Sequence, residues 1–125
     1  MTTTTRGRQS HAEWDTFLGK KQSRKITHNT WANRIGKEIH VVYHKTSVVI
    51  YKGDGRIELN SGGWKTATTK NRINRYSPAQ VWQVTKKKGD DPTWYISHVS
   101  LNADGEFEDG IEFYEETQRK EVANG

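Results

Sequence analysis

The part of the sequence best suited to bind an anion lies between residues 62 and 75. Two adjacent glycines, Gly62 and Gly63, allow the backbone to approach a ligand closely, and the indole of Trp64 offers a face on which a base can stack. A predicted helix follows, and the backbone N–H groups and dipole at a helix N-terminus favour an anion. The hydroxyl and cationic side chains before and within that helix are Lys65, Thr66, Thr68, Thr69, Lys70, Arg72 and Arg75. The segment predicts a phosphate or nucleotide site, although it lacks the G-x-x-x-x-G-K-[ST] spacing of a P-loop.

A structural interpretation of the same segment stays open. In that interpretation the glycines form a turn, Trp64 belongs to the core and the threonines only cap the helix. The two interpretations differ in the exposure of Trp64 and in whether Lys70 and Arg72 face acidic neighbours.

Two histidines precede a hydroxyl residue in the same way, in residues 44–46 (His-Lys-Thr) and 98–100 (His-Val-Ser). In two-histidine phosphoesterases such motifs lie on facing strands, where one imidazole acts as the acid and the other as the base. We therefore add His44 and Thr46 to the candidate ligand-binding residues and keep a phosphoesterase as a less favoured alternative.

The sequence offers little other catalytic or metal chemistry. It has no cysteine and no G-x-S-x-G elbow, so no activated nucleophile is recognisable. His40 and His44 would lie about 13 Å apart along an extended strand, too far to bind one ion. We expect no metal and no cofactor, and the sequence favours a binding protein over an enzyme without excluding one.

The elements that must position these residues are mostly strands. Alternation over 39–44 and a β-branched run over 48–51 predict two strands, and Gly53-Asp54-Gly55 predicts a hairpin turn to a third at 56–59. A helix is predicted from Thr68 or Thr69 to about residue 76. A second hairpin over 81–85 and 93–99, and a last strand over 107–113 with a bulge at 109–110, complete the pattern. The expected fold class is α+β: a small antiparallel β-sheet domain with one short internal helix and an N-terminal helical arm.

The first 25 residues are expected to form a flexible basic arm. Ser10 can cap a short helix over 11–18, with Glu13 completing a capping box. The apolar residues Trp14, Phe17 and Leu18 share one face of that helix and are the candidate partner-binding residues. A linker over 20–25 then leads into a single domain over 26–114, and residues 115–125 form an acidic tail. The arm is a candidate contact for a homo-oligomer.

Charge is distributed unevenly along the 125 residues. Residues 1–37 carry eight basic and two acidic side chains, whereas residues 106–125 carry two basic and seven acidic ones, and the net charge is +5. A basic front half attracts polyanions such as nucleic acid. No run of 18 apolar residues is present, so we expect no membrane partner.

Several segments together resemble a group of small, uncharacterised bacteriophage proteins. The matching residues are 27–31 (THNTW), 44–49 (HKTSVV) and 59–74 (LNSGGWKTATTKNRIN), with 94–96 (WYI) and 107–111 (FEDGI) toward the end. They correspond to the group's N-x-T-W/Y, H-x-T-x-V-V and G-G-W-x-T-x-T-T-K-x-R-I-N motifs. Ser47 stands where an acidic residue is common, and His28 where a second asparagine is usual. The resemblance implies a phage origin and a location in the host cytoplasm, and it brings no activity or catalytic residue with it.

Four functions are compatible with these residues. The favoured one is a non-enzymatic protein that binds nucleic acid through the basic Gly-Gly-Trp surface. The alternative is a phage counter-defence protein that sequesters a nucleotide signal or inhibits a host protein. An assembly role through the arm and a two-histidine phosphoesterase are the remaining two.

Overall fold

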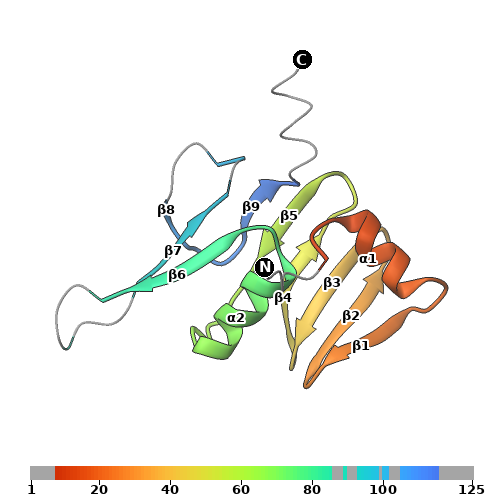
Figure 1. The fold of residues 1–125 in the computed structure, drawn as a ribbon, viewed down its shortest axis with the longest axis horizontal. Helices are drawn as coiled ribbons and strands as arrows, with labels where there is room; N and C mark the ends of the chain where they lie inside the picture. Colours follow the sequence, from red (N-terminus) through yellow and green to blue (C-terminus); the bar gives the residue numbers. More distant parts are fainter. Residues whose placement is uncertain (1–7, 86–88, 90–92, 99, 102–104, 116–125) are drawn as a thin grey trace, which may run out of the picture.

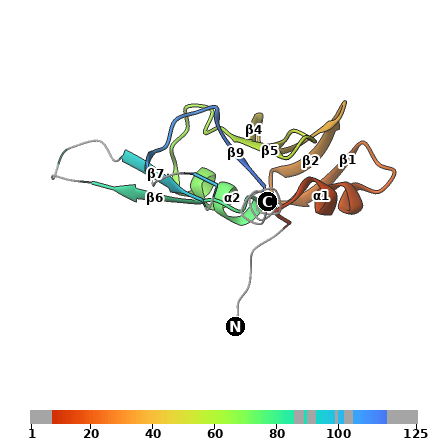
Figure 2. The same ribbon diagram turned by 90° about the horizontal axis from the view of Figure 1, so that it is seen from above.

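A six-stranded antiparallel sheet forms one layer of the molecule, and both helices lie against one face of it (Figures 1 and 2). The computed structural model describes residues 8–85, 89, 93–98, 100–101 and 105–115. The strand order is β1-β2-β3-β4-β5-β9, so five strands follow one another as a meander and the last strand adds beside β5. These strands are β1 (Ser23–Thr27), β2 (Thr30–Ile35), β3 (Glu38–Tyr43), β4 (Thr46–Tyr51), β5 (Arg56–Leu59) and β9 (Ile111–Tyr114).

The face of the sheet that turns toward the helices is apolar. Cross-strand register aligns the side chains of this face in two rows, and side chains of directly paired residues point to the same side of a sheet. One row contains Ala32, Val41, Val49 and Leu59, and the other contains Ile39, Tyr51, Ile57 and Phe113. All of these residues are buried, so the two rows form the floor of the core.

Helix α1 (His11–Leu18) has the predicted bounds and caps. The hydroxyl of Ser10 accepts a hydrogen bond from the Glu13 backbone N–H at 3.2 Å, and Gly19 ends the helix with φ +58°. Glu13 does not return a bond to the Ser10 N–H, as a standard capping box would. Its carboxylate accepts instead from the Gln9 N–H at 3.0 Å and from the Ser10 hydroxyl.

The apolar face of α1 packs inside this chain. Trp14 and Leu18 are 0 % and 1 % exposed in the main core, and Phe17 is half-buried between the guanidinium groups of Arg8 and Arg24. The expectation that Trp14, Phe17 and Leu18 form a partner-binding face therefore differs from the structure. A helix this short is not stable alone in water, and the sheet of its own domain supplies the missing contacts.

Helix α2 (Ala67–Tyr76) joins the two sheets. It packs on β3 and β4 and contacts β6 (Gln80–Val84), the first strand of a three-stranded sheet with β7 (Thr93–Ser97) and β8 (Gly105–Glu106). The Asn74 amide bonds both backbone groups of Val81, accepting from its N–H at 2.7 Å and donating to its carbonyl at 2.9 Å. The side chain thus replaces a neighbouring strand at the open edge of β6.

The broad expectation of an α+β protein is confirmed: the chain is mostly antiparallel sheet with two short helices. Strands β1 and β2 were not predicted, and residues 23–25, expected in a linker, belong to the sheet. The α2 cap is Thr66, two or three residues earlier than predicted. Asp109 and Gly110 are not a bulge within one strand, because they form a turn between β8 and β9, which belong to different sheets.

Several expectations fall partly or wholly outside the described residues. They are the tail before residue 8, most of the loop over 86–92, Val99 at the end of the second hairpin, the turn at 102–104 and the acidic tail from residue 116. Glu115, expected in that tail, is buried, and its carboxylate accepts from the His11 backbone N–H at 3.4 Å. Among the described residues, no helix is long and apolar enough to cross a membrane.

Candidate functional site

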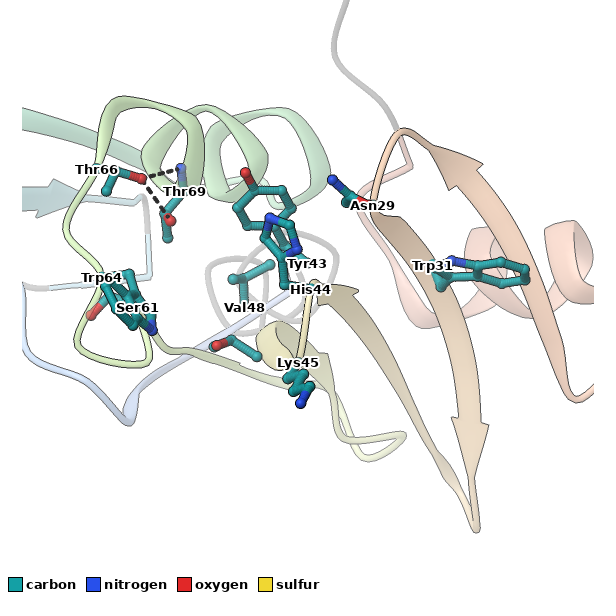
Figure 3. Close-up of a pocket in the computed structure, with 11 residues that line it drawn as sticks. Asn29, Trp31, Tyr43, His44, Lys45, Val48, Ser61, Trp64, Thr66 and Thr69 are labelled. Atoms are coloured by element: carbon teal, nitrogen blue, oxygen red, sulfur yellow. Dashed lines mark hydrogen bonds between the residues drawn. The ribbon is translucent and has the colours of Figure 1, made fainter.

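An open pocket of about 680 Å³ lies where two hairpin turns of the main sheet meet the loop before α2 (Figure 3). The β2 and β3 ends supply one side, and the loop over 60–66 with the first turn of α2 supplies the other. Its described lining residues are Asn29, Trp31, Tyr43, His44, Lys45, Thr46, Val48, Ser61, Trp64, Thr66 and Thr69. Volumes of this order are typical of small-molecule sites.

Residues in left-handed backbone conformation build the rim of the pocket. Asn29 (φ +53°) and His44 (φ +56°) turn the chain between β1 and β2 and between β3 and β4. Non-glycine residues adopt this conformation rarely, and they mark turns that the surrounding structure holds in place. Gly62 adopts φ +66° directly beside Thr46, where an added Cβ would lie 2.5 Å from the threonine Oγ1. The Gly-Gly-Trp segment and the His-Lys-Thr segment therefore meet in direct contact at Gly62.

A carboxylate from the far end of the chain fixes the loop that carries Trp64. Asp109 Oδ1 accepts from the Ser61 N–H at 2.7 Å, and its Oδ2 accepts from the Ser61 hydroxyl at 3.1 Å. Ser61 in turn receives the Gly63 N–H on its hydroxyl and the Trp64 N–H on its carbonyl. The indole of Trp64 projects from this fixed loop and is 68 % exposed.

The first turn of α2 contributes hydroxyl groups to the pocket. Thr66 Oγ1 accepts from the Thr69 N–H at 3.2 Å and lies 3.0 Å from the Thr69 hydroxyl, so these two threonines cap the helix and line the pocket at once (Figure 3). One turn further along α2, the guanidinium of Arg72 lies over the ring of Tyr43 at 5.3 Å and donates to the Thr30 hydroxyl. Tyr43 also contacts the imidazole of His44, whose ring is tilted by 52° with its centroid 4.4 Å from that of the phenol ring.

The described lining of the pocket carries positive charge from Lys45 and no carboxylate, since Asp109 lies behind Ser61 and is not a lining residue. None of its described lining residues is acidic, and Lys45 forms no ion pair with any residue that the structure describes. No cluster of His, Asp and Glu among the described residues has the arrangement of a metal site. The pocket therefore suits an anionic or aromatic ligand better than a metal ion.

Carboxylates gather instead on the outer face of the sheet. The ammonium of Lys52 lies 2.9 Å from Glu58, 3.7 Å from Glu112 and 3.8 Å from Glu38. The hydrogen bond with Glu58 is the main reason why the pKa of Lys52 is raised. Partial burial acts to raise the pKa of Glu58, but hydrogen bonds from Asn60 and Lys52 outweigh it and hold that pKa below its usual value. One ammonium among three carboxylates leaves this part of the outer face net negative, so an anionic ligand is favoured at the pocket and disfavoured here.

The structure brings together part of the predicted ligand set. His44, Thr46, Trp64, Thr66 and Thr69 line one pocket although they come from two separate segments. The other members, which are not among the lining residues, are Gly62, Gly63, Lys65, Thr68, Lys70, Arg72 and Arg75. Of these, Gly62 and Arg72 support the pocket wall as described above, whereas the Arg75 guanidinium lies 6.0 Å from the Tyr76 ring.

The second histidine motif does not contribute to the pocket. His98 is not a lining residue; its Nδ1 is 3.0 Å from the Ser100 hydroxyl and its ring packs against Phe113 at 4.5 Å. The arrangement of two imidazoles around one phosphate, which the phosphoesterase alternative requires, is not assembled in this pocket.

Sequence reasoning missed six lining residues, namely Asn29, Trp31, Tyr43, Lys45, Val48 and Ser61. A signal existed for several of them, since Asn29 and Trp31 belong to the THNTW segment, and Tyr43 and Lys45 flank the predicted His44. The sequence did not predict that β2 pairs with β3, and this pairing places Trp31 at the rim of the pocket.

A comparison with protein-family models finds a match that covers most of the chain. A family model described as Kyanoviridae Gp96 protein matches residues 7–114, a range that includes every element of the fold. No curated protein and no solved structure matches the chain. The resemblance to a bacteriophage group is thereby supported at the level of the family, and the chain belongs to the bacteriophage family of Kyanoviridae Gp96 proteins.

Proposed function

We propose that this protein binds nucleic acid without catalysing a reaction, and that the pocket around His44 and Trp64 is the binding site. The observation that carries the proposal is the exposure of Trp64. A tryptophan that is 68 % exposed contributes little to the core, and its position on a loop fixed by Asp109 favours stacking against a ligand.

The surroundings of Trp64 support an anionic ligand. Lys45 and the hydroxyls of Thr46 and Thr66 supply donors, and the described lining contains no carboxylate to repel a phosphate. Arg72 adds a second cation behind Tyr43. Aromatic faces combined with scattered cations are the usual composition of surfaces that bind single strands independently of sequence.

Fluorescence anisotropy with labelled single-stranded and duplex DNA and RNA at 50 mM salt tests the proposal. We expect single strands to bind, binding to weaken as salt rises, and Trp64→Ala to reduce affinity about tenfold. Trp82→Ala is the matched control, because Trp82 is 37 % exposed on β6 and does not line the pocket. Failure of every DNA and RNA to bind at 50 mM salt rejects the proposal.

A second candidate is the capture of a free nucleotide, as a counter-defence protein would require. The volume of the pocket favours it, because about 680 Å³ accommodates one small molecule. Calorimetry against a panel of mononucleotides and cyclic nucleotides separates the two candidates. Stoichiometric saturation by one nucleotide, with no competition from long polymers, supports capture over nucleic-acid binding.

A further inference from the structure

The pocket has two exposed tryptophans, and they stand on opposite sides of His44. Figure 3 shows Trp64, from the loop before α2, on one side of the histidine and Trp31, from β2, on the other. Trp31 is 43 % exposed even though it lies within a strand of the main sheet. Two separate aromatic faces on opposite sides of the histidine can each stack a base.

Exposed lysines accompany the tryptophans along the chain and across the sheet. Lys65 follows Trp64 directly, and Lys45 lies in the turn between the two indoles. On the far side, Lys25 of β1 pairs with Trp31 in the register of the sheet, so both side chains are on the same face. All three lysines are exposed, and none forms an ion pair with a described residue.

We infer that Lys65, Trp64, Lys45, Trp31 and Lys25 form one continuous track for a single nucleic-acid strand, with one base stacked on each tryptophan. This inference rests on the proposed function and adds to it the class of ligand and its path. The strand crosses the β3–β4 turn, where Lys45 meets the phosphates between the two bases. A duplex does not fit this arrangement, since stacked and paired bases cannot reach the indole faces.

The residues of the track favour a nucleic-acid strand over a mononucleotide as the ligand. A mononucleotide occupies one indole and leaves the other tryptophan and at least one outer lysine without a role. A strand uses both indoles and all three cations, so its affinity must grow with length. For three phosphate contacts on a single strand, the slope of log affinity against log salt is about −2.

Binding of oligothymidylates of one, two, four, six and eight nucleotides to the full chain tests the inference. We expect affinity to rise at least tenfold from the mononucleotide to the longest oligomer. Trp31→Ala and Trp64→Ala should each weaken the octamer about tenfold. Lys25→Gln, Lys45→Gln and Lys65→Gln should each reduce the magnitude of the salt slope by about 0.7. Lys37→Gln is the matched control, because Lys37 is an exposed lysine in the turn at the opposite end of β2 and β3.

The outcomes separate the inference from the function on which it rests. If the octamer binds and Trp64→Ala weakens it while Trp31→Ala and Lys25→Gln have no effect, the track is overturned and the proposed function stands. If a mononucleotide binds as tightly as the octamer, the track is overturned in favour of nucleotide capture. If neither the octamer nor the mononucleotide binds at 50 mM salt, the track is overturned, and the proposed function falls with it only if the single-stranded and duplex DNA and RNA of the anisotropy panel also fail to bind. Circular dichroism of each variant establishes that it is folded, which is expected because all five side chains are exposed.

Discussion

Gly62 is a position where a single methyl group should change the molecule. Its φ of +66° disfavours any side chain, and an added Cβ would lie 2.5 Å from Oγ1 and 2.7 Å from Cγ2 of Thr46. We expect Gly62→Ala to lower the free energy of unfolding by about 2–4 kcal/mol, measured by urea denaturation, since it combines backbone strain with a steric clash. Gly63→Ala is the control: its φ is +83° and nothing lies within 4 Å of its added Cβ, so only the strain of about 1–2 kcal/mol applies.

The clash has a partner that can be removed. Thr46→Ala deletes both offending atoms, so it should recover part of the stability in the Gly62→Ala background and none in the Gly63→Ala background. Equal losses for the two glycine variants, with no rescue, would show that Gly62 does not hold the two segments together.

Two glutamates should respond to pH in opposite directions. Burial raises the pKa of Glu115, so its ionised form is less favourable in the folded protein than in the unfolded chain. The free energy of unfolding therefore falls as the pH rises above 4.5, the ordinary pKa of this carboxyl group. The pKa of Glu58 is lowered despite its partial burial, because Asn60 and Lys52 donate hydrogen bonds to its carboxylate. Its contribution to the free energy of unfolding is therefore present above pH 4.5 and is lost as the pH falls below that value. Urea denaturation between pH 3 and 8 should therefore show that, at pH 7, Glu115→Gln raises the free energy of unfolding and Glu58→Gln lowers it. Changes of the same sign would contradict these assignments.

At the scale of elements, the turn between β8 and β9 supports the loop that carries Trp64. Asp109→Ala removes both acceptors from buried Ser61, and we expect a loss of about 1–3 kcal/mol of stability together with weaker binding of single strands. Glu108→Ala is the control, since Glu108 is the exposed acidic neighbour. If both variants behave alike in denaturation and in anisotropy, Asp109 is not a positioning residue for the loop.

The caps of α1 and the hairpin turn before β5 were predictable because their signals are local. The Ser10 cap and the Gly19 stop of α1 agree with the sequence pattern, as does the hairpin turn at 53–55. Strand β2 was missed because its pattern is inverted: Trp31 and Ile35 are exposed, whereas the smaller Thr30 and Ala32 are buried. Large apolar residues on the outer face of this strand gave no amphipathic signal.

The candidate site was predictable only in fragments. The Gly-Gly-Trp and His-Lys-Thr segments were recognised separately, but their contact at Gly62 and Thr46 depends on the pairing of β3, β4 and β5. Thr69 and Arg72 were assigned to a ligand from their residue types and from their position at or within a predicted helix. Both have roles inside the fold, one in the α2 cap and one against Thr30 and Tyr43.

At the scale of the whole molecule, α1 closes the core. Trp14 contacts the rings of Tyr51 and Tyr76, which belong to β4 and α2, so it joins three elements. We expect Trp14→Ala to cost about 3–5 kcal/mol and to lower the midpoint of thermal unfolding strongly. Trp82→Ala should cost far less, because Trp82 is partly exposed on the outer hairpin. A variant at Trp14 that keeps its melting temperature and changes only its elution volume would favour an assembly role.

The contact between His11 and Glu115 spans 104 positions of the chain. During synthesis α1 can pack on β2 and β3 as soon as these strands emerge, whereas the hydrogen bond from His11 to Glu115 forms only after β9 has been made. A product that terminates before β9 lacks this bond and leaves the β5 edge of the main sheet without its pairing strand, open to association with another chain.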